Sequence, residues 1–452
     1  MSVRPTRRAL SAAVCLTAAA VLAGLTAAPS SAAPSSAAPS SAASGGKDRA
    51  GGPTAARFAT FNVSMFRNTD GELARDLAVA ADEKQDEEVR NVAEIIQRQR
   101  PDVLLLNEFD HDQGGVALRR FQDNFLDVAQ APGVDPIDYP YAVAFPSNTG
   151  IASGFDLNRN GTVGTSGRAY GDDSFGFGEF PGQYAFAVLS RFPLDIAGAR
   201  TFQRFRWADM PGARLPDDAA TAEPGDFYSD EVLKVFRLSS KNHVDLPVRV
   251  GGRTIHLLAS HPTPPVFDGP EDRNGTRNAD EIRLWQDYVT PGAADYLLDD
   301  AGRRGGLDRG AAFVVMGDLN ADPAEDGDGV AGAAAQIVEQ RFVRDPLPSS
   351  AGGSEASRLQ GGANLGHRGD PALDTADFND RPGASGNLRA DYVLPSRPLG
   401  VRDAGVFWPV RADPLSRLTG VFNPSFSNGF PSSDHRMVWV DLSVPGGGRG
   451  RP

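Results

Sequence analysis

The chain has 452 residues, a length that accommodates one large α/β domain or two to three smaller domains. Hydrophobic residues make up 40% and charged residues 23% of the chain, a globular composition that excludes wholesale disorder. The formal net charge of −13 argues against broad non-specific binding to polyanions. It leaves room for a local basic groove, or for metal ions that neutralise a phosphate.

The N-terminus has the features of a targeting segment. Basic residues, among them Arg7 and Arg8, precede an alanine-rich apolar run over 9–28, and small-residue cleavage sites with Ala-Pro-Ser-Ser repeats follow. This order is typical of a secretory signal peptide, and the lack of a basic stop-transfer cluster disfavours a membrane anchor. We therefore expect a secreted protein, and the resemblance of Arg7-Arg8 to a twin-arginine signal offers export after folding as one route.

These observations predict the organisation of the chain. Residues 1–43 form a signal peptide and low-complexity leader, 44–53 a flexible linker, 54–446 the folded domain and 447–452 a disordered tail. The single cysteine, Cys15, lies in the leader that is removed. Disulfides, thiolate catalysis and cysteine-based zinc sites are therefore excluded for the mature protein.

Short apolar runs bounded by Gly and Pro recur along the domain and predict strands. They cover residues 57–63, 103–107, 141–145, 184–190, 244–250, 254–260, 312–316, 391–394 and 437–442. Gly251-Gly252 between two of these runs predicts a hairpin turn.

Two segments show helical periodicity, and several others show none. Residues 82–100 predict a helix that Pro101 ends, and 280–288 predict a second, with Thr290-Pro291 beginning a third. Strands and helices mix without strict alternation, which favours an α/β or α+β sandwich. Three Gly/Pro/Asp-rich stretches read as loop insertions, at 146–183, 203–230 and 345–388.

Polar side chains stand at the ends of many of the predicted strands. Such positions place side chains at one edge of a sheet, where functional sites form. Each alone has a structural explanation, such as an Asx turn or a satisfied histidine. Together and in this order they indicate a site: Asn62, Glu108, His261, Asp318, Asn320, Asp391, Asp434 and His435.

The residue types indicate the chemistry of this site. Oxygen ligands suit Mg²⁺, Mn²⁺ or Ca²⁺ rather than zinc, and five candidates offer them: Asn62, Glu108, Asp318, Asn320 and Asp434. Histidines beside carboxylates supply proton transfer near neutral pH. This equipment favours metal-assisted attack of water on a phosphorus ester. Strand parity selects His261, which shares a face with Ile255 and Leu257, over His256, which we interpret as structural.

At this point the sequence resembles the endonuclease/exonuclease/phosphatase superfamily, which includes deoxyribonuclease-type nucleases, bacterial sphingomyelinases and inositol polyphosphate phosphatases. The resemblance spans about residues 57–443 and rests on the motifs FNVS, LLLNEF, LLASHPTP, VMGDLNADP, RADYVLPS and PSSDHRMVWVDL. It implies a four-layer α/β/β/α sandwich with two mixed sheets packed face to face.

The resemblance also implies metal ligands. Glu108 matches the principal metal ligand, with Asn62 and Asp434 close to the ion. Asp318 matches the aspartate that orients or deprotonates the attacking water, and Asn320 its partner in phosphate or metal binding.

It further implies the catalytic histidines. His435 matches the histidine of the last motif, and Asp391 the acidic residue that orients it. His261 matches the second histidine, which contacts substrate phosphate in the deoxyribonuclease, sphingomyelinase and inositol-phosphatase branches.

The function expected is a secreted divalent-metal-dependent phosphoester hydrolase, most simply a phosphodiesterase that acts as a monomer without an obligate protein partner. Its substrate stays open between nucleic acid, phospholipid or sphingomyelin, and inositol phosphates. An inactive secreted binding scaffold is the alternative of another class.

Two acidic features stay open between a cation site and an ordinary loop. Residues 156–161 resemble the start of a calcium loop, but Gly167 stands where the last ligand would be a glutamate, so an Asx-rich turn is favoured. A second acidic cluster follows Asn320 and reads as a second cation site or a solvated loop, with Asp322, Glu325, Asp326 and Asp328.

Overall fold

The computed structural model describes residues 53–78, 87–325 and 329–446. Contacts divide the chain into Met1–Arg49 and Ala50–Pro452, and the first unit lies wholly outside the described residues. The predicted signal peptide, most of the linker and the C-terminal tail therefore also lie outside them. None of the helices in the described ranges combines the length and apolar character that crossing a membrane requires.

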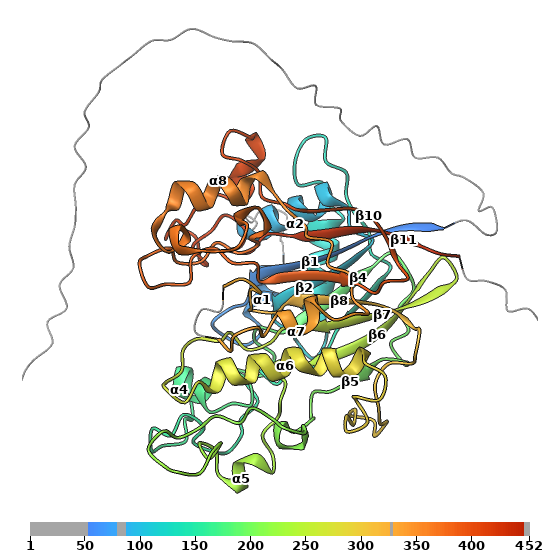
Figure 1. The fold of residues 1–452 in the computed structure, drawn as a ribbon. Helices are drawn as coiled ribbons and strands as arrows, with labels where there is room; N and C mark the ends of the chain where they lie inside the picture. Colours follow the sequence, from blue (N-terminus) through green and yellow to red (C-terminus); the bar gives the residue numbers. More distant parts are fainter. Residues whose placement is uncertain (1–52, 79–86, 326–328, 447–452) are drawn as a thin grey trace, which may run out of the picture. The chain divides into compact units, whose positions relative to one another are not determined.

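Two β-sheets form the centre of the domain (Figure 1). The first sheet has the order β10-β11-β1-β2-β4-β3, and the second has the order β5-β6-β7-β8-β9. The strands span Thr54–Met65 (β1), Val103–Phe109 (β2), Tyr141–Ala144 (β3), Phe186–Ser190 (β4), Arg200–Thr201 (β5), His243–Val250 (β6), Arg253–Ser260 (β7), Ala312–Asp318 (β8), Asp391–Pro395 (β9), Gly400–Val406 (β10) and Val438–Val444 (β11).

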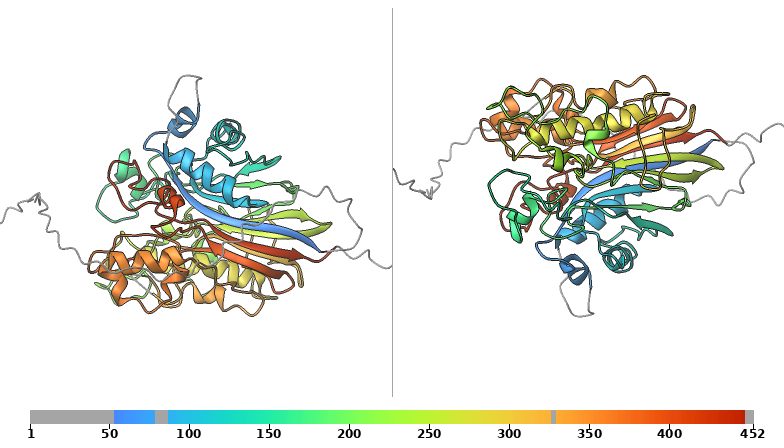
Figure 2. Two further views of the ribbon diagram at one scale, coloured as in Figure 1. Left: turned by 90° about the horizontal axis from the view of Figure 1, so that it is seen from above. Right: turned by 90° about the horizontal axis from the view of Figure 1, so that it is seen from below.

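The helices lie outside the two sheets, so that helices, sheet, sheet and helices form successive layers (Figure 2). The α-helices span Glu72–Asp76 (α1), Glu87–Gln99 (α2), Val116–Phe121 (α3), Gly167–Asp172 (α4), Asp230–Leu233 (α5), Arg273–Val289 (α6), Ala335–Val338 (α7) and Ala351–Gln360 (α8). The α/β sandwich expected from the sequence, with two mixed sheets face to face, is confirmed.

Alternation along the strands builds three apolar cores. In β1, Phe58 packs into the core between the sheets, whereas Ala59 and Phe61 pack into the core under α2 and α3. In β8, Val314 faces the other sheet and Val315 faces the core under α6. Because both sheets are covered on both faces, their strands read as continuous apolar runs rather than as alternating ones.

The predicted hairpin is present, whereas two short features of the fold escaped prediction. Gly251 and Gly252 have φ angles of 57° and 80° and join β6 to β7, which pair antiparallel. Such positive φ values favour glycine in a two-residue hairpin turn. Strand β5 has too few residues to form a pattern, and β10 lies at the edge of its sheet with exposed polar positions.

Helix α6, which follows the β6–β7 hairpin, is longer than predicted. Helix α6 begins at Arg273 and not near 280. The apolar pattern did not reveal this start, because the first turns bury polar rather than apolar side chains, including Asn278 and Glu281. Thr290 ends α6 and begins no new helix, so that prediction was wrong. The helix predicted over 82–100 is α2, whose described residues begin at Glu87.

Candidate active site

Strand direction brings the predicted residues to one edge of both sheets. Strands β1 and β2 run parallel, as do β7 and β8, so the carboxyl ends of each pair lie together. Strands β9 and β11 run antiparallel to β8 and β1. The beginnings of β9 and β11 therefore lie beside the ends of their partners, which places Asp391 next to Asp318 across the ladder.

Strand parity then turns several of these side chains into the space between the sheets. Asn62 continues the inward face of β1 that Phe58 begins, and Asp318 continues the face of Val314 and Met316. His261 likewise follows the inward residues of β7 by parity. The result is a polar cluster that closes the open end of the central core.

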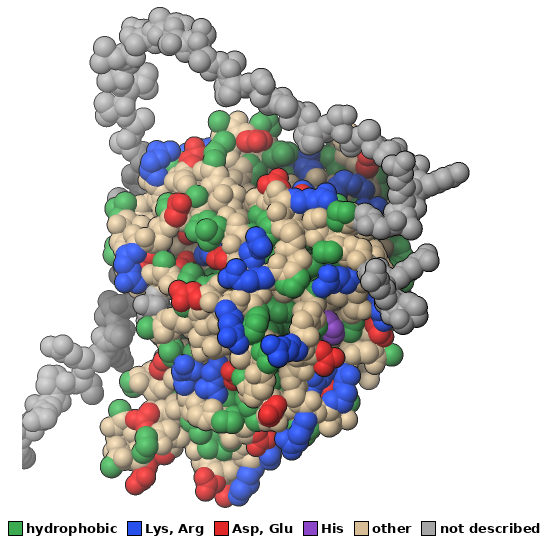
Figure 3. Space-filling model, turned by 45° about the vertical axis from the view of Figure 1, so that its right-hand side comes forward, with side chains coloured by type: hydrophobic (Ala, Val, Ile, Leu, Met, Phe, Trp, Pro, Cys, Tyr) green, Lys and Arg blue, Asp and Glu red, His purple; other side chains and the backbone are tan. Residues whose placement is uncertain are grey.

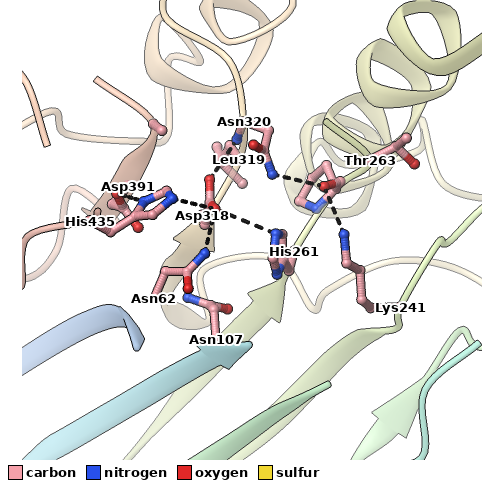
Figure 4. A network of polar contacts seen from close by, with 12 residues as sticks. Asn62, Asn107, Lys241, His261, Thr263, Asp318, Leu319, Asn320, Asp391 and His435 are labelled. Atoms are coloured by element: carbon pink, nitrogen blue, oxygen red, sulfur yellow. Dashed lines mark hydrogen bonds and ion pairs between the residues drawn. The ribbon is translucent and has the colours of Figure 1, made fainter. Parts of the chain in front are cut away.

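Asp318 lies at the centre of this cluster (Figure 4). Its Oδ2 accepts a hydrogen bond from Asn62 Nδ2 at 3.1 Å and lies 3.4 Å from His261 Nε2. The same oxygen lies 3.6 Å from His435 Nε2, and Oδ1 accepts from the backbone N–H of Asn320 at 2.9 Å. One buried carboxylate therefore connects four predicted residues, of which Asn62 lies in β1 and the other three lie just outside the ends of β7, β8 and β11.

A second chain of contacts holds His435. Its Nδ1 lies 2.8 Å from Asp391 Oδ2, and the same oxygen accepts a hydrogen bond from the Thr375 hydroxyl at 2.8 Å. Asp318, Asp391 and His435 carry ligand-type atoms within 4.8 Å of one another and are all buried. Because Nδ1 already faces Asp391, the imidazole presents Nε2 toward Asp318.

Glu108 and Asp434 form the other side of the site. Both are half-buried, and both line the same pocket as Asp318 and His435. The Ser64 hydroxyl donates to Asp434 Oδ1 at 3.1 Å, and no Lys or Arg of the described residues forms an ion pair with either carboxylate. Burial first, and then the charge of Asp434, raise the pKa of Glu108 to about 7. Two neighbouring carboxylates without a basic partner suit a bound divalent cation.

Backbone strain concentrates at this site. Ser64, Glu108 and Asn320 have φ angles of 48°, 55° and 51°, in the left-handed region that side chains other than glycine seldom adopt. Such conformations persist where the surrounding structure enforces them, and they gather at functional sites. Here they turn the chain sharply where β1, β2 and β8 end, and so re-aim the polar side chains.

The two histidines have opposite electrostatic environments. Burial lowers the pKa of His435, but the charges of Asp391 and Asp318 outweigh it, so the pKa lies well above its usual value. Burial lowers the pKa of His261 well below its usual value, and the charges of Lys241 and His435 add to this. At neutral pH His435 is therefore protonated and His261 is neutral, a difference typical of an acid and a base in one active site.

Asp318 is held between these two rings as a weakly acidic carboxyl. Burial raises its pKa to about 6, with Asp391 adding to the rise, while His435 and hydrogen bonds from Asn62 and Asn320 oppose it. A carboxylate whose pKa lies near neutrality is suited to accept a proton from water.

Comparison with known proteins identifies the fold family. Residues 59–435 match the Endonuclease/Exonuclease/phosphatase family. The chain belongs to this family. It is therefore related to metal-dependent phosphoester hydrolases, as the sequence motifs predicted. No curated protein matches the chain at a significant level.

Several solved structures are similar to this chain at low sequence identity. An endonuclease/exonuclease/phosphatase from Beutenbergia cavernae DSM 12333 is 16% identical, with 87% of this chain and 72% of that chain covered and a TM-score of 0.43. A family protein from Leptotrichia buccalis C-1013-b is 16% identical over 86% of this chain and 100% of that chain, with a TM-score of 0.42. A mannosyl-6-phosphatase from Bacteroides thetaiotaomicron VPI-5482 is 12% identical over 86% and 100%, with a TM-score of 0.39.

Lys241 is a candidate functional residue that the sequence motifs did not include. The structure buries it beside the site, where its Nζ contacts the carbonyl oxygen of Pro262 at 3.5 Å and no carboxylate of the described residues pairs with it. Asn320 Nδ2 donates to the same carbonyl at 3.2 Å. In the sequence, the only signal for a functional role of Lys241 is its position just before a strand, in the segment SKNH.

A buried glutamate fixes this part of the site and was missed altogether. Glu281 of α6 accepts the backbone N–H groups of Ser240 and Thr263, both at 2.6 Å. It thereby ties together the loops on either side of Lys241 and His261. Its sequence neighbourhood is a polar helix start, which carries no signal for a buried role.

The remaining histidine and loop candidates have structural partners. His256 Nδ1 lies 2.7 Å from Asp245, in agreement with a structural role. The 156–161 segment forms Asx-type bonds, in which Asp156 accepts the backbone N–H groups of Asn160 and Gly161. These bonds account for its Asx-rich sequence.

A pocket with a volume of about 640 Å³ opens onto the site. Glu108, Asp318, Asn320, Asp434 and His435 line it, and Lys241 lies in the same lining. Its other walls are largely apolar and aromatic and come partly from the predicted insertions, including Phe66, Leu157, Phe177, Tyr184, Tyr228, Phe236, Val266, Phe267 and Phe378.

Proposed function

We propose that this protein is a secreted, divalent-metal-dependent phosphodiesterase that cleaves organic phosphodiesters carrying an apolar group. The observation that carries the proposal is the joint lining of one pocket by two unpaired carboxylates, Glu108 and Asp434, and by the Asp318–His435 pair. The leader predicted over residues 1–43 supports secretion.

The donor set fits a hard cation such as Mg²⁺. In our proposal Glu108 and Asp434 hold the ion, with Asn62 beside them, because both acids line the pocket and neither forms an ion pair with a Lys or Arg of the described residues. Bound there, the ion would offset the negative charge that develops on the phosphoryl oxygens.

The proton steps follow from the protonation states. Asp318 orients a water molecule and takes its proton as the water oxygen forms a bond to phosphorus. The bond to the leaving oxygen breaks, and His435, held protonated by Asp391, gives that oxygen a proton. Neutral His261 offers a ring N–H to the phosphoryl oxygens. Both ring nitrogens of His261 are buried without a hydrogen-bond partner among the described residues, and Nε2 lies 3.4 Å from Asp318 Oδ2.

Lys241 supplies the remaining positive charge at the phosphate. Burial lowers its pKa, while Glu281, Glu108 and Asp318 oppose this. A buried ammonium group that contacts one carbonyl oxygen has donors left for an anionic substrate.

The pocket walls favour an amphiphilic substrate over a polyanion. Phe267 lines the pocket yet is 78% exposed, which suits contact with the apolar part of a lipid substrate such as a phospholipid or sphingomyelin. The three arginines in the lining are engaged: Arg277 donates to backbone carbonyls, Arg168 pairs with Asp172, and Arg273 pairs with Glu271. Figure 3 shows a different face of the molecule, on which basic and acidic side chains are interspersed.

A substrate panel tests the proposal. The purified protein is assayed with bis(4-nitrophenyl) phosphate, 4-nitrophenyl phosphate, sphingomyelin in mixed micelles, plasmid DNA and inositol hexakisphosphate. We expect the diesters to be cleaved faster than the monoesters, EDTA to abolish turnover and added Mg²⁺ or Mn²⁺ to restore it.

Two variants distinguish turnover by this protein from turnover by a contaminating enzyme. Asp318→Asn is expected to lose turnover, whereas Asp403→Asn, at an exposed position of the edge strand β10, keeps it. Turnover that survives both EDTA and Asp318→Asn would refute the mechanism. Faster release of phosphate from inositol hexakisphosphate than cleavage of any diester would refute the substrate class.

A further inference from the structure

A second cavity of about 130 Å³ lies beside the main pocket. It is enclosed by the loop that follows Asn320 and by the 367–374 part of the insertion between β8 and β9. Its lining contains an unusual number of carboxylates, namely Asp322, Glu325, Asp370 and Asp374.

Asp374 is the unsatisfied member of this group. The residue is 6% exposed, and its Oδ2 is buried without a hydrogen-bond partner among the described residues. Arg389 lines the same cavity, but its guanidinium forms two hydrogen bonds with Asp345 instead. His367 also lies in the lining, and its Nε2 faces the carbonyl oxygen of Ser385. A buried carboxylate without a partner is costly, so the group is either protonated or compensated by a cation that enters the cavity.

The other three carboxylates are fixed by backbone N–H groups. Asp322 accepts from Ala324 and Arg389, at 2.7 and 2.8 Å. Glu325 accepts from Arg368 and Gly369, and Asp370 accepts from Ala372 at 3.0 Å. These bonds hold negative charge at the cavity wall from both segments. The Arg368 guanidinium also approaches the wall, where it donates to the carbonyl oxygen of Ala324 at 2.6 Å.

We propose that this cavity is a second divalent-cation site, with Asp374 as its central ligand and Ca²⁺ as its preferred ion. All four candidate side chains offer oxygen, which excludes a preference for soft metals. Within the described residues, only Asp318, Asp391 and His435 bring three ligand atoms within 4.8 Å, so the cavity carboxylates stand further apart. Ca²⁺ tolerates irregular geometry and completes its shell with water, whereas Mg²⁺ demands a near-ideal octahedron.

The burial of Asp374 has a consequence for the metal-free protein. Burial, and then the charges of Asp322, Glu325 and Asp370, raise the pKa of Asp374 to about 8. Near neutral pH the carboxyl holds a proton that a cation must displace. Binding is therefore tighter at higher pH.

The position of the cation site allows it to affect catalysis indirectly, through residues that orient the active site. Asp374 directly precedes Thr375, whose hydroxyl donates to Asp391 and whose carbonyl accepts from the backbone N–H of Arg436. A cation at Asp374 would fix the segment that orients Asp391 and the strand start that carries His435. Asp374 is in this sense a positioning residue for the active site.

Calcium titration calorimetry on the full chain at pH 8 tests the site, with Ca²⁺ raised to about 5 mM because extracellular sites bind at about 10⁻⁴–10⁻³ M. We expect Asp374→Asn to bind one Ca²⁺ fewer than the unaltered protein, and the matched control Asp403→Asn to bind the same number. The difference in stoichiometry does not depend on how many ions the active site binds. The test of the second cation site is therefore independent of the proposed function.

Thermal unfolding distinguishes a lost ligand from a misfolded variant. Without metal at pH 8, Asp374→Asn is expected to unfold at the same or a higher temperature than the unaltered protein, because the substitution removes a buried charge. With Ca²⁺, the unaltered protein gains stability and the variant gains less. Equal stoichiometry and equal Ca²⁺-dependent gains in both proteins would overturn the proposal, as would loss of one ion from the Asp403→Asn control.

Discussion

At the scale of single residues, neighbouring carboxylates decide which of the two active-site histidines holds a proton. His435 sits 2.8 Å from Asp391, whereas His261 has Lys241 and His435 as its charged neighbours apart from Asp318. The same two side chains would titrate alike in water. Their distinct roles therefore belong to the folded arrangement and not to the residue type.

Replacing Asp391 by Asn tests this division. The amide keeps the shape of the side chain but removes the charge that raises the pKa of His435. We expect kcat to fall by about 10²–10⁴-fold, a range typical of lost acid–base assistance, with little change in KM. Steady-state kinetics on bis(4-nitrophenyl) phosphate measure this, with Asp403→Asn as the control. A kcat within about threefold of the unaltered protein would contradict the role of the pair.

Replacing Lys241 by Met tests the phosphate contact. The apolar chain fills the buried space, so stability is expected to stay equal or rise, because a desolvated ammonium group is removed. Loss of a charge-assisted hydrogen bond of about 1.5–3 kcal/mol lowers kcat/KM by about 10–100-fold. Thermal unfolding and kinetics are measured together. A less stable variant that retains full kcat/KM would assign Lys241 to the fold instead.

At the scale of elements, the close approach of β7 and β8 explains the glycine in Gly-Asp-Leu-Asn. Gly317 has a φ of 150°, and a Cβ placed there would meet the carbonyl oxygen of Ser260 at 1.9 Å. The next residue is Asp318, so the backbone contact directly sets the height of the central carboxylate. A motif that reads as an Asx turn in sequence is thus also a packing requirement.

Gly317→Ala is expected to destabilise the protein by about 1–3 kcal/mol and to lower activity further than instability explains. The extra methyl forces β8 away from β7 and displaces Asp318. Gly252→Ala is the matched control, because Gly252 also has a positive φ but nothing lies within 4 Å of its Cβ position. Chemical denaturation and kinetics distinguish the two. Full activity of folded Gly317→Ala would refute the packing argument.

At the scale of the whole molecule, several buried acids make the metal-free protein sensitive to alkaline pH. Burial is the first cause that raises the pKa of Glu108 and Asp110 to about 7 and that of Asp374 to about 8. Each keeps its proton longer in the folded state than in the unfolded state. The stability they contribute is present in full below their unfolded pKa values and is lost as pH rises through about 7–8.

In EDTA, we therefore expect the melting temperature to fall between pH 6.5 and pH 9. Ca²⁺ and Mg²⁺ should offset most of this fall, because they replace the lost protons at Glu108 and Asp374. Asp374→Asn should show a shallower fall in EDTA than the unaltered protein. A melting temperature that is constant or rises over this range without metal would contradict the assignment of buried, unpaired carboxylates.

The sequence by itself determined the local features of this protein. Apolar runs bounded by Gly and Pro marked most strands, Gly251-Gly252 marked a hairpin, and motifs at strand ends marked the family and the candidate residues. These signals are local, since they depend on backbone propensity and on side-chain alternation over a few neighbouring positions. The polar start of α6 carried no such signal, because its buried side chains bond to loops that are distant in sequence.

Only the tertiary structure decided what these residues do to one another. Asn62 and Asp318 are separated by 256 positions, and their contact requires the pairing and direction of several strands. The same packing of strands and loops buries Lys241 without an ion pair to an acidic side chain of the described residues and places Thr375 against Asp391. It also leaves Asp374 Oδ2 without a hydrogen-bond partner among those residues. Burial and charge depend on all surrounding segments at once, so the protonation states and the second cavity follow from the packed molecule alone.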